Sequence, residues 1–195
     1  MAGPALNFSP ELVLRAQGRG LGLKAAIFDV DGVLTDGRIT IGEHGETVKA
    51  FSTLDGQGLK LLVLGGITPI IITGRDSPAV RRRVADLGLL HAVYGSHDKL
   101  AAAQTLLATL GLGWEDVAVM GDDWPDLPLL SRAAFACAPA NAHGEAKALA
   151  HHVTAALGGH GAARELCDLL LMANGRYPTL LQAQRQAHLN TLDNA

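Results

Sequence analysis

Short apolar runs alternate with longer amphipathic stretches along most of this chain. The apolar runs are too short for helices, and their unbroken apolar character is typical of strands buried on both faces. They lie at 25–30, 68–73, 92–94, 117–120, 134–137 and near 152–153. Stretches with helical spacing lie between or after them, at 56–64, 77–87, 98–110 and 162–173. This alternation predicts an α/β fold of three layers, Rossmann-like, with a mostly parallel central sheet between helices.

Two segments depart from the alternation. Residues 38–41 and 46–51 alternate between polar and apolar around the sequence GEHG, which predicts a protruding β-hairpin. Ser9 and Pro10 predict the start of a short helix that ends near Gly18. We therefore expect an N-terminal extension over 1–23, one domain over 24–178 with a hairpin flap at 37–51, and a polar, poorly patterned tail over 179–195.

Composition narrows the class of protein. A length of 195 residues fits one domain, and a net charge of −3 argues against non-specific nucleic-acid binding. Cys137 and Cys167 form no CxxC motif and no framework of bridges, which favours a reducing compartment. The most apolar stretch, 59–73, is interrupted by two glycines and a proline, and we see no signal peptide. We expect a cytoplasmic protein that binds neither nucleic acid nor membranes.

Polar side chains stand where several of the predicted strands end or the next helix begins. They are Asp29 and Asp31, Thr73, Lys99, and the group Asp122, Asp123 and Asp126. Because the carboxyl ends of parallel strands meet at one edge of a sheet, all of them can face one site. Carboxylates suit Mg²⁺, a threonine hydroxyl and the Gly74 amide can bind a phosphoryl oxygen, and a lysine supplies positive charge. The combination favours phosphoryl transfer.

Each feature alone has an ordinary explanation. An Asp-x-Asp pair often forms a turn, a threonine often ends a strand, and a single lysine is usually exposed. Acidic residues also cap helices and favour the helix dipole. The chemical interpretation rests on the occurrence of all four features in order, each at the end of an element.

That ordered set resembles the four motifs of the haloacid dehalogenase-like (HAD) superfamily. DVDGVLTD resembles the first motif, 71–75 (IITGR) the second, Lys99 the third and 121–126 (GDDWPD) the fourth. The resemblance implies that Asp29 is the nucleophile and forms an aspartyl-phosphate. It implies that Asp31 protonates the leaving oxygen and then activates water, which separates this chain from dehalogenases.

The resemblance also implies the ligands of the site. Thr73 and Lys99 would hold the phosphoryl group, and Mg²⁺ would lie between Asp29, the backbone carbonyl of Asp31 and Asp122. Asp123 and Asp126 would orient metal-bound waters or Lys99. Neither gap between motifs has room for a cap domain, so the hairpin must pack either on a neighbouring subunit or on its own domain.

Among uncapped members, the chain is most similar to the 3-deoxy-D-manno-octulosonate 8-phosphate (KDO 8-phosphate) phosphatases. The supporting stretches are 48–60, 71–77, 121–130 and 158–171. The similarity implies a homotetramer with the hairpin and C-terminal tail at subunit interfaces, and Arg164 either near a partner's site or packed at its own helix start. It implies a substrate pocket of Asp31, Ser52, Thr53, Leu54, Asp55, Gly56, Lys60, Gly74, Arg75, Arg83 and Lys99. Leu54 and Lys60 stand where the family pattern has arginine.

Several functions remain open at this point. The first is Mg²⁺-dependent hydrolysis of KDO 8-phosphate, whose carboxylate would explain additional cations near the pocket. A second is hydrolysis of a related nonulosonate 9-phosphate or another phosphosugar. A third, from a different class, is a non-catalytic assembly module partnered with a nucleotide-sugar synthetase.

Overall fold

The described part of the chain, in a computed structural model, comprises residues 8–18, 22–43 and 45–192. Six parallel strands form the central sheet in the order β5-β4-β1-β6-β7-β8. Their bounds are β1 (Ala25–Phe28), β4 (Thr68–Ile72), β5 (His91–Val93), β6 (Val117–Met120), β7 (Phe135–Ala138) and β8 (His152–Val153). Every residue of β1, β6 and β7 is buried, as their unbroken apolar sequence predicts.

The strand register aligns the carboxyl ends of the central strands. Phe28, the last residue of β1, pairs with Ile71 of β4 on one side and with Met120 of β6 on the other. Ile72, the last residue of β4, pairs with Val93 of β5. The loops after these four strands therefore start at one edge of the sheet.

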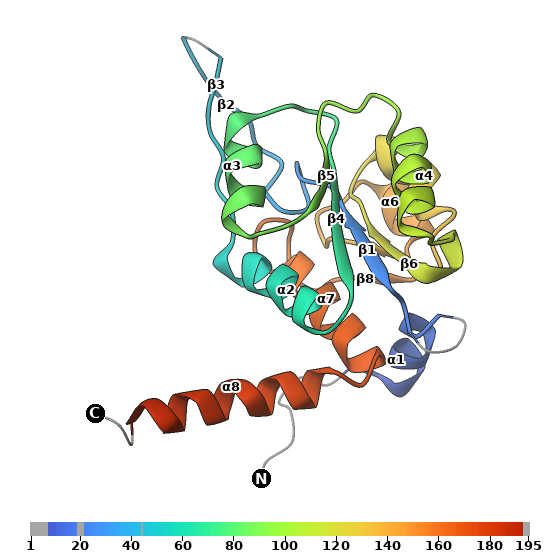
Figure 1. The fold of residues 1–195 in the computed structure, drawn as a ribbon. Helices are drawn as coiled ribbons and strands as arrows, with labels where there is room; N and C mark the ends of the chain where they lie inside the picture. The colour runs from blue at the N-terminus through green and yellow to red at the C-terminus, as the bar shows by residue number, and fades with distance from the viewer. Residues whose placement is uncertain (1–7, 19–21, 44, 193–195) are drawn as a thin grey trace.

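Helices cover both faces of the sheet (Figure 1). One face carries α1 (Pro10–Ala16), α2 (Thr53–Leu64), α3 (Pro78–Asp86) and α7 (Ala162–Ala173). The other face carries α4 (Lys99–Leu110), α5 (Leu127–Leu130) and α6 (Gly144–Leu149). Short 3-10 turns at Trp114–Asp116 and Trp124–Asp126 precede β6 and α5. The predicted three-layer α/β fold is confirmed.

The hairpin is present and stands clear of the sheet. Strands β2 (Thr40–Gly42) and β3 (Gly45–Val48) pair antiparallel, over a shorter span than the sequence pattern indicates. Their far end projects beyond the body of the molecule (Figure 1). Ile41 and Val48 are 73% and 62% exposed, so their own domain does not cover these two apolar side chains, whereas Phe51 at the base of the hairpin packs against the core.

The C-terminal tail forms a helix that the apolar pattern does not indicate. Helix α8 (Tyr177–Leu192) starts with Tyr177 and Leu180 partly buried against the core, and then extends away from the body (Figure 1). The sequence of this helix has no continuous apolar stripe, so its periodicity does not indicate a helix. The last three residues of the predicted tail over 179–195, residues 193–195, lie outside the described part of the chain.

The N-terminal extension also contributes to the core. Ser9 caps α1 by accepting a hydrogen bond from the Leu12 amide, and Ala16 at the end of α1 is fully buried beside α7. The domain boundary predicted at residue 24 stays a prediction.

In the ranges described above, no helix combines the length and the apolar character needed to cross a bilayer.

Candidate active site

The four predicted polar features converge at the carboxyl edge of the sheet. Asp29 follows β1, Thr73 follows β4, Lys99 begins α4 after β5, and Asp122 follows β6. They line one open pocket of about 370 Å³ together with Asp31, Gly74, Arg75, Asp123 and Asp126. The convergence expected from a parallel sheet is confirmed.

Lys99 is the centre of charge in this pocket. Its Nζ lies 2.8 Å from Asp29 Oδ1 and 2.7 Å from Asp126 Oδ1. Burial alone would lower the pKa of Lys99, but the negative charges of Asp29 and Asp126 outweigh burial and raise it. Lys99 therefore remains an ammonium ion while it is buried.

Asp126 fixes the direction of that ammonium group. Its Oδ1 accepts the hydrogen bond from Lys99, and its Oδ2 accepts from the backbone amides of Asp122 and Asp123 at 3.1 and 3.4 Å. A Cβ on Gly121 would lie 2.4 Å from Asp126 Cβ, so only glycine fits there. Of the two roles expected for Asp126, this geometry fits the orientation of Lys99.

The remaining carboxylates form a site suited to a divalent cation. Asp29, Asp122 and Asp126 each place one oxygen within 4.8 Å of the others. Asp29 Oδ1 and Asp122 Oδ1 are buried and accept no hydrogen bond. Lys99 Nζ lies at an ion-pair distance from Asp29 Oδ1 but outside hydrogen-bond geometry. Since Asp126 is already engaged by Lys99 and two amides, Asp29 and Asp122 are the carboxylates free for a metal such as Mg²⁺.

The pKa values reflect this crowding of negative charge. Burial, followed by the charge of Asp126, raises the pKa of Asp29 although Lys99 opposes the effect. Burial, together with the charges of Asp29 and Asp126, raises the pKa of Asp122 to about 8. A bound cation would relieve this repulsion, as expected for carboxylates that share a metal.

Gly32 makes room for Asp122. Its φ is +99°, and a Cβ at this position would lie 2.1 Å from Asp122 Oδ2. The glycine after the Asp29–Asp31 pair is therefore required both by its backbone conformation and by the carboxylate opposite it.

Asp31 and Thr73 face the same pocket. Asp31 Oδ1 forms an ion pair with Lys49, and Asp31 Oδ2 lies 4.0 Å from Arg75 Nε. Thr73 Oγ1 accepts a hydrogen bond from the Arg75 amide, which leaves the hydroxyl proton free to be donated. Thr73 is thus suited to bind an anionic oxygen in the pocket.

The substrate residues inferred from the family resemblance divide into two groups. Asp31, Gly74, Arg75 and Lys99 line the pocket. The other predicted residues lie at or beside α2: Ser52 caps α2, the Asp55 carboxylate accepts from the amides of Gly161 and Arg164, and Arg83 donates to the Ser52 carbonyl. Gly56 packs against the Arg83 guanidinium, and Thr53, Leu54 and Lys60 are exposed.

Asp55 has a structural role within the chain that its sequence position does not indicate. It is buried, and its two oxygens satisfy amides at the start of α7, although it lies in the first turn of α2. Arg164, considered for a partner's site, donates from Nε to both Asp168 oxygens at 2.8 Å in its own chain. Contacts of these residues with a substrate stay predictions.

Sequence reasoning missed Lys49 and Glu46. Both lie in or next to β3, where strand alternation makes them look like solvent-facing polar positions. In the structure, the Lys49 side chain is 1% exposed and contacts Asp31. The available signal was a lysine within the predicted hairpin flap at 37–51, which follows the Asp29–Asp31 pair in the chain.

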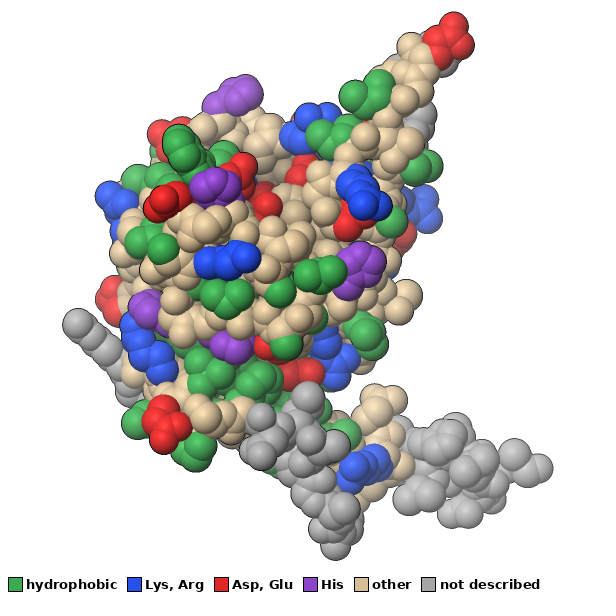
Figure 2. All heavy atoms as spheres, turned by 180° about the vertical axis from the view of Figure 1, so that it is seen from behind, with side chains coloured by type: hydrophobic (Ala, Val, Ile, Leu, Met, Phe, Trp, Pro, Cys, Tyr) green, Lys and Arg blue, Asp and Glu red, His purple; other side chains and the backbone are tan. Residues whose placement is uncertain are grey.

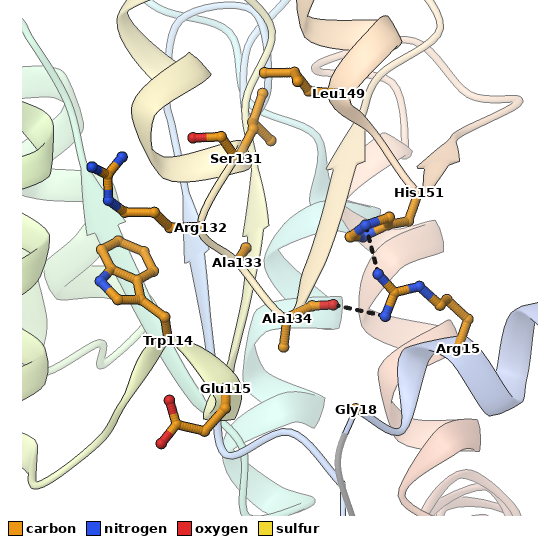
Figure 3. A pocket seen from close by; sticks show the side chains of 11 residues that line it. Arg15, Gly18, Trp114, Glu115, Ser131, Arg132, Ala133, Ala134, Leu149 and His151 are labelled. Atoms are coloured by element: carbon orange, nitrogen blue, oxygen red, sulfur yellow. Dashed lines mark hydrogen bonds between the residues drawn. The ribbon is translucent and has the colours of Figure 1, made fainter.

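A larger cavity of about 650 Å³ lies at the opposite, amino edge of the sheet. Figure 3 shows Arg15 reaching from α1 toward the Ala134 carbonyl and the His151 ring, with Trp114 and Arg132 on the other side. Arg15 donates to Ala134 O at 3.1 Å and lies 2.6 Å from His151 Nε2. Since its lining lacks the carboxylate cluster and lies at the amino ends of the strands, we place the chemistry at the smaller pocket.

Comparison with known proteins agrees with this geometry. Residues 89–166 match the family of haloacid dehalogenase-like hydrolases. Over 168 residues, covering 86% of this chain and 87% of the relative, the chain is 41% identical to the 3-deoxy-D-manno-octulosonate 8-phosphate phosphatase KdsC of Salmonella typhimurium.

Two solved structures of phosphatases are likewise similar to this chain over most of its length. A probable YrbI family phosphatase from Pseudomonas syringae is 46% identical with a TM-score of 0.84, covering 93% of this chain and 98% of that one. The Moraxella catarrhalis 3-deoxy-D-manno-octulosonate 8-phosphate phosphatase, solved with magnesium, phosphate and KDO, is 37% identical with a TM-score of 0.83, covering 89% and 97%. With this identity over most of its length, the chain belongs to the 3-deoxy-D-manno-octulosonate 8-phosphate phosphatase family of haloacid dehalogenase-like hydrolases.

Proposed function

We propose that this protein is a Mg²⁺-dependent phosphatase that hydrolyses KDO 8-phosphate to KDO and phosphate. The observation that carries the proposal is the grouping of Asp29, Asp122 and the Lys99 ammonium in one pocket. Family membership and the bound ligands of the Moraxella catarrhalis relative support the choice of substrate.

The proposed reaction uses the chain's own residues in two steps. Asp29 attacks phosphorus and forms an aspartyl-phosphate, while Asp31 gives a proton to the departing sugar oxygen. Asp31 then removes a proton from the water that hydrolyses the intermediate. Thr73 and Lys99 hold the phosphoryl oxygens during both steps. Asp29 and Asp122 would hold a divalent cation, which would supply the positive charge that offsets the repulsion between carboxylate and phosphate.

The assembly and the location of the protein are part of the proposal. The exposed apolar side chains of the hairpin and the projecting helix α8 support a homotetramer with both elements at subunit interfaces. Contacts of Ser52, Thr53 and Lys60 with substrate would then depend on the assembled form. The unpaired, buried Cys137 and Cys167 fit a reducing compartment, in line with a cytoplasmic enzyme.

A phosphate-release assay with Mg²⁺ tests the proposal. The panel contains KDO 8-phosphate, a nonulosonate 9-phosphate, a hexose phosphate and p-nitrophenyl phosphate. We expect the highest kcat/KM for KDO 8-phosphate, and no turnover by Asp29→Asn.

Other outcomes separate the alternatives. Preference for the nonulosonate 9-phosphate would favour the second candidate, which Leu54 and Lys60 make worth testing because they replace arginines of the family pattern. No turnover of any phosphosugar would favour a non-catalytic assembly role. Preference for a hexose phosphate would refute the substrate while leaving the chemistry in place.

A further inference from the structure

Lys49 is a buried cation that the reaction described above does not use. It follows β3 at the base of the hairpin, and its side chain is 1% exposed. A lysine ammonium is rarely buried unless anionic partners compensate for the loss of water. Here the partners are Asp31 Oδ1, with which Lys49 forms a hydrogen-bonded ion pair, and Glu46 Oε2 at 3.5 Å.

Glu46 is itself held from the opposite side. Its Oε1 accepts a hydrogen bond from Ser77 Oγ at 2.7 Å, and its Oε2 accepts one from Arg75 Nη2 at 3.2 Å. Burial would raise the pKa of Glu46, but the Ser77 hydrogen bond, the charge of Lys49 and the Arg75 hydrogen bond outweigh burial and lower the pKa. Glu46 therefore stays ionised and links the hairpin to the loop after β4.

These contacts form a continuous chain from the hairpin to Asp31. Ser77 and Arg75 fix Glu46, Glu46 holds the Lys49 ammonium, and the ammonium holds one oxygen of Asp31. Arg75 lies farther from Asp31, with Nε 4.0 Å from Oδ2, and it is about half exposed. The close restraint on Asp31 therefore comes from Lys49.

We propose that Lys49 is the positioning residue for Asp31, and that it orients this carboxyl group toward the leaving oxygen of the substrate. The inference rests on the proposed phosphatase function. As the Asp29 oxygen bonds to phosphorus and the bond from phosphorus to the sugar oxygen breaks, a proton carried by Asp31 on Oδ2, the oxygen that Lys49 does not contact, passes to the sugar oxygen. A carboxyl group that turned freely would miss this transfer in part of the encounters.

The leaving group makes this role measurable. p-Nitrophenolate leaves without a proton, whereas phenolate and a sugar alkoxide depend increasingly on proton donation. The quantity to compare is kcat/KM, because it reports the steps up to formation of the aspartyl-phosphate and leaves out the hydrolysis that all substrates share. Phenyl phosphate and p-nitrophenyl phosphate are similar in shape and lack a sugar carboxylate.

The experiment uses the full-length protein with Mg²⁺ and the variant Lys49→Met, which keeps the length of the side chain and removes its charge. We expect kcat/KM for KDO 8-phosphate to fall about 10²-fold and that for phenyl phosphate at least about tenfold, as for a misplaced catalytic group. For p-nitrophenyl phosphate we expect a change within about threefold. Lys24→Met is the matched control, since Lys24 pairs with Asp116 at the surface, and all three rates should stay at wild-type values.

Two results would overturn the inference. Equal losses for p-nitrophenyl phosphate and phenyl phosphate would show a general structural role. A loss confined to KDO 8-phosphate, with both aryl phosphates at wild-type rates, would show that Lys49 contacts the sugar.

A second variant covers the case in which Lys49→Met does not fold. Glu46→Gln removes the charge that holds Lys49 and keeps an acceptor for Ser77, and we expect the same difference between leaving groups at smaller size. A folded Glu46→Gln without that difference would also refute the role. Failure of the wild-type protein to release phosphate from KDO 8-phosphate would instead refute the proposed function.

Discussion

Substitution of Gly32 by alanine should separate metal binding from folding. Gly32 has φ +99°, and the new Cβ would lie 2.1 Å from Asp122 Oδ2, whereas real Cβ contacts essentially never fall below 3.0 Å. The Asp122 carboxylate must therefore move by about 1 Å or rotate, and a displacement of that size in a reacting group costs on the order of 10²-fold in rate.

The stability cost should be modest, because the clash involves the end of a side chain. An L-residue in the left-handed region costs about 1–2 kcal/mol. Gly66 provides a matched control, since its φ is +81° and, apart from its neighbours in the chain, no atom of the described residues lies within 4 Å of its Cβ position. Gly66→Ala should show the same kind of backbone cost with no effect on the site.

The assays are thermal unfolding, Mg²⁺ binding by calorimetry and phosphate release. We expect both variants to unfold at a similarly reduced temperature, while only Gly32→Ala binds Mg²⁺ weakly and loses about 10²-fold in kcat/KM. Gly32→Ala with wild-type Mg²⁺ affinity and turnover would refute the placement of Asp122 as a metal ligand.

Three further perturbations address other parts of the site. Lys99→Ala should lose most phosphate release while circular dichroism shows a folded protein, and wild-type rates would contradict its role in holding the phosphoryl group. Because burial raises the pKa of Asp29 and Asp122, these groups should make the metal-free protein less stable as pH rises from about 4 toward 8. Mg²⁺ should therefore raise the unfolding temperature more at pH 8 than at pH 5.5. An equal rise at the two pH values would contradict this. Ile41→Asp with Val48→Asp should reduce the mass measured by light scattering, and an unchanged mass would exclude the hairpin from the subunit interface.

The sequence predicts the residues at the carboxyl edge of the sheet well, because their positions depend only on the local pattern of strands and helices. Each candidate follows an apolar run, and parallel pairing brings the ends of such runs together without knowledge of side-chain packing. Asp29, Thr73 and Asp122 could be placed this way, and Lys99 follows from its position at the start of a helix after β5.

Other features depend on contacts between distant segments. The role of Asp55 is set by the amides of α7, more than 100 residues later in the chain, and no local pattern indicates that partner. Lys49 looks like an exposed strand residue until the hairpin base folds over Asp31. On the face drawn in Figure 2, lysine and arginine side chains are spread out rather than gathered in one patch, so charge alone would not single out Lys49.

The identity of the nucleophile is the claim on which the account depends most directly. Acid quenching during turnover of KDO 8-phosphate, followed by borohydride reduction, converts an acyl-phosphate on aspartate to homoserine, which peptide mass spectrometry can locate. We expect homoserine at Asp29 and at no other aspartate. Full turnover with Asp29 unmodified, or modification at another carboxylate, would contradict it.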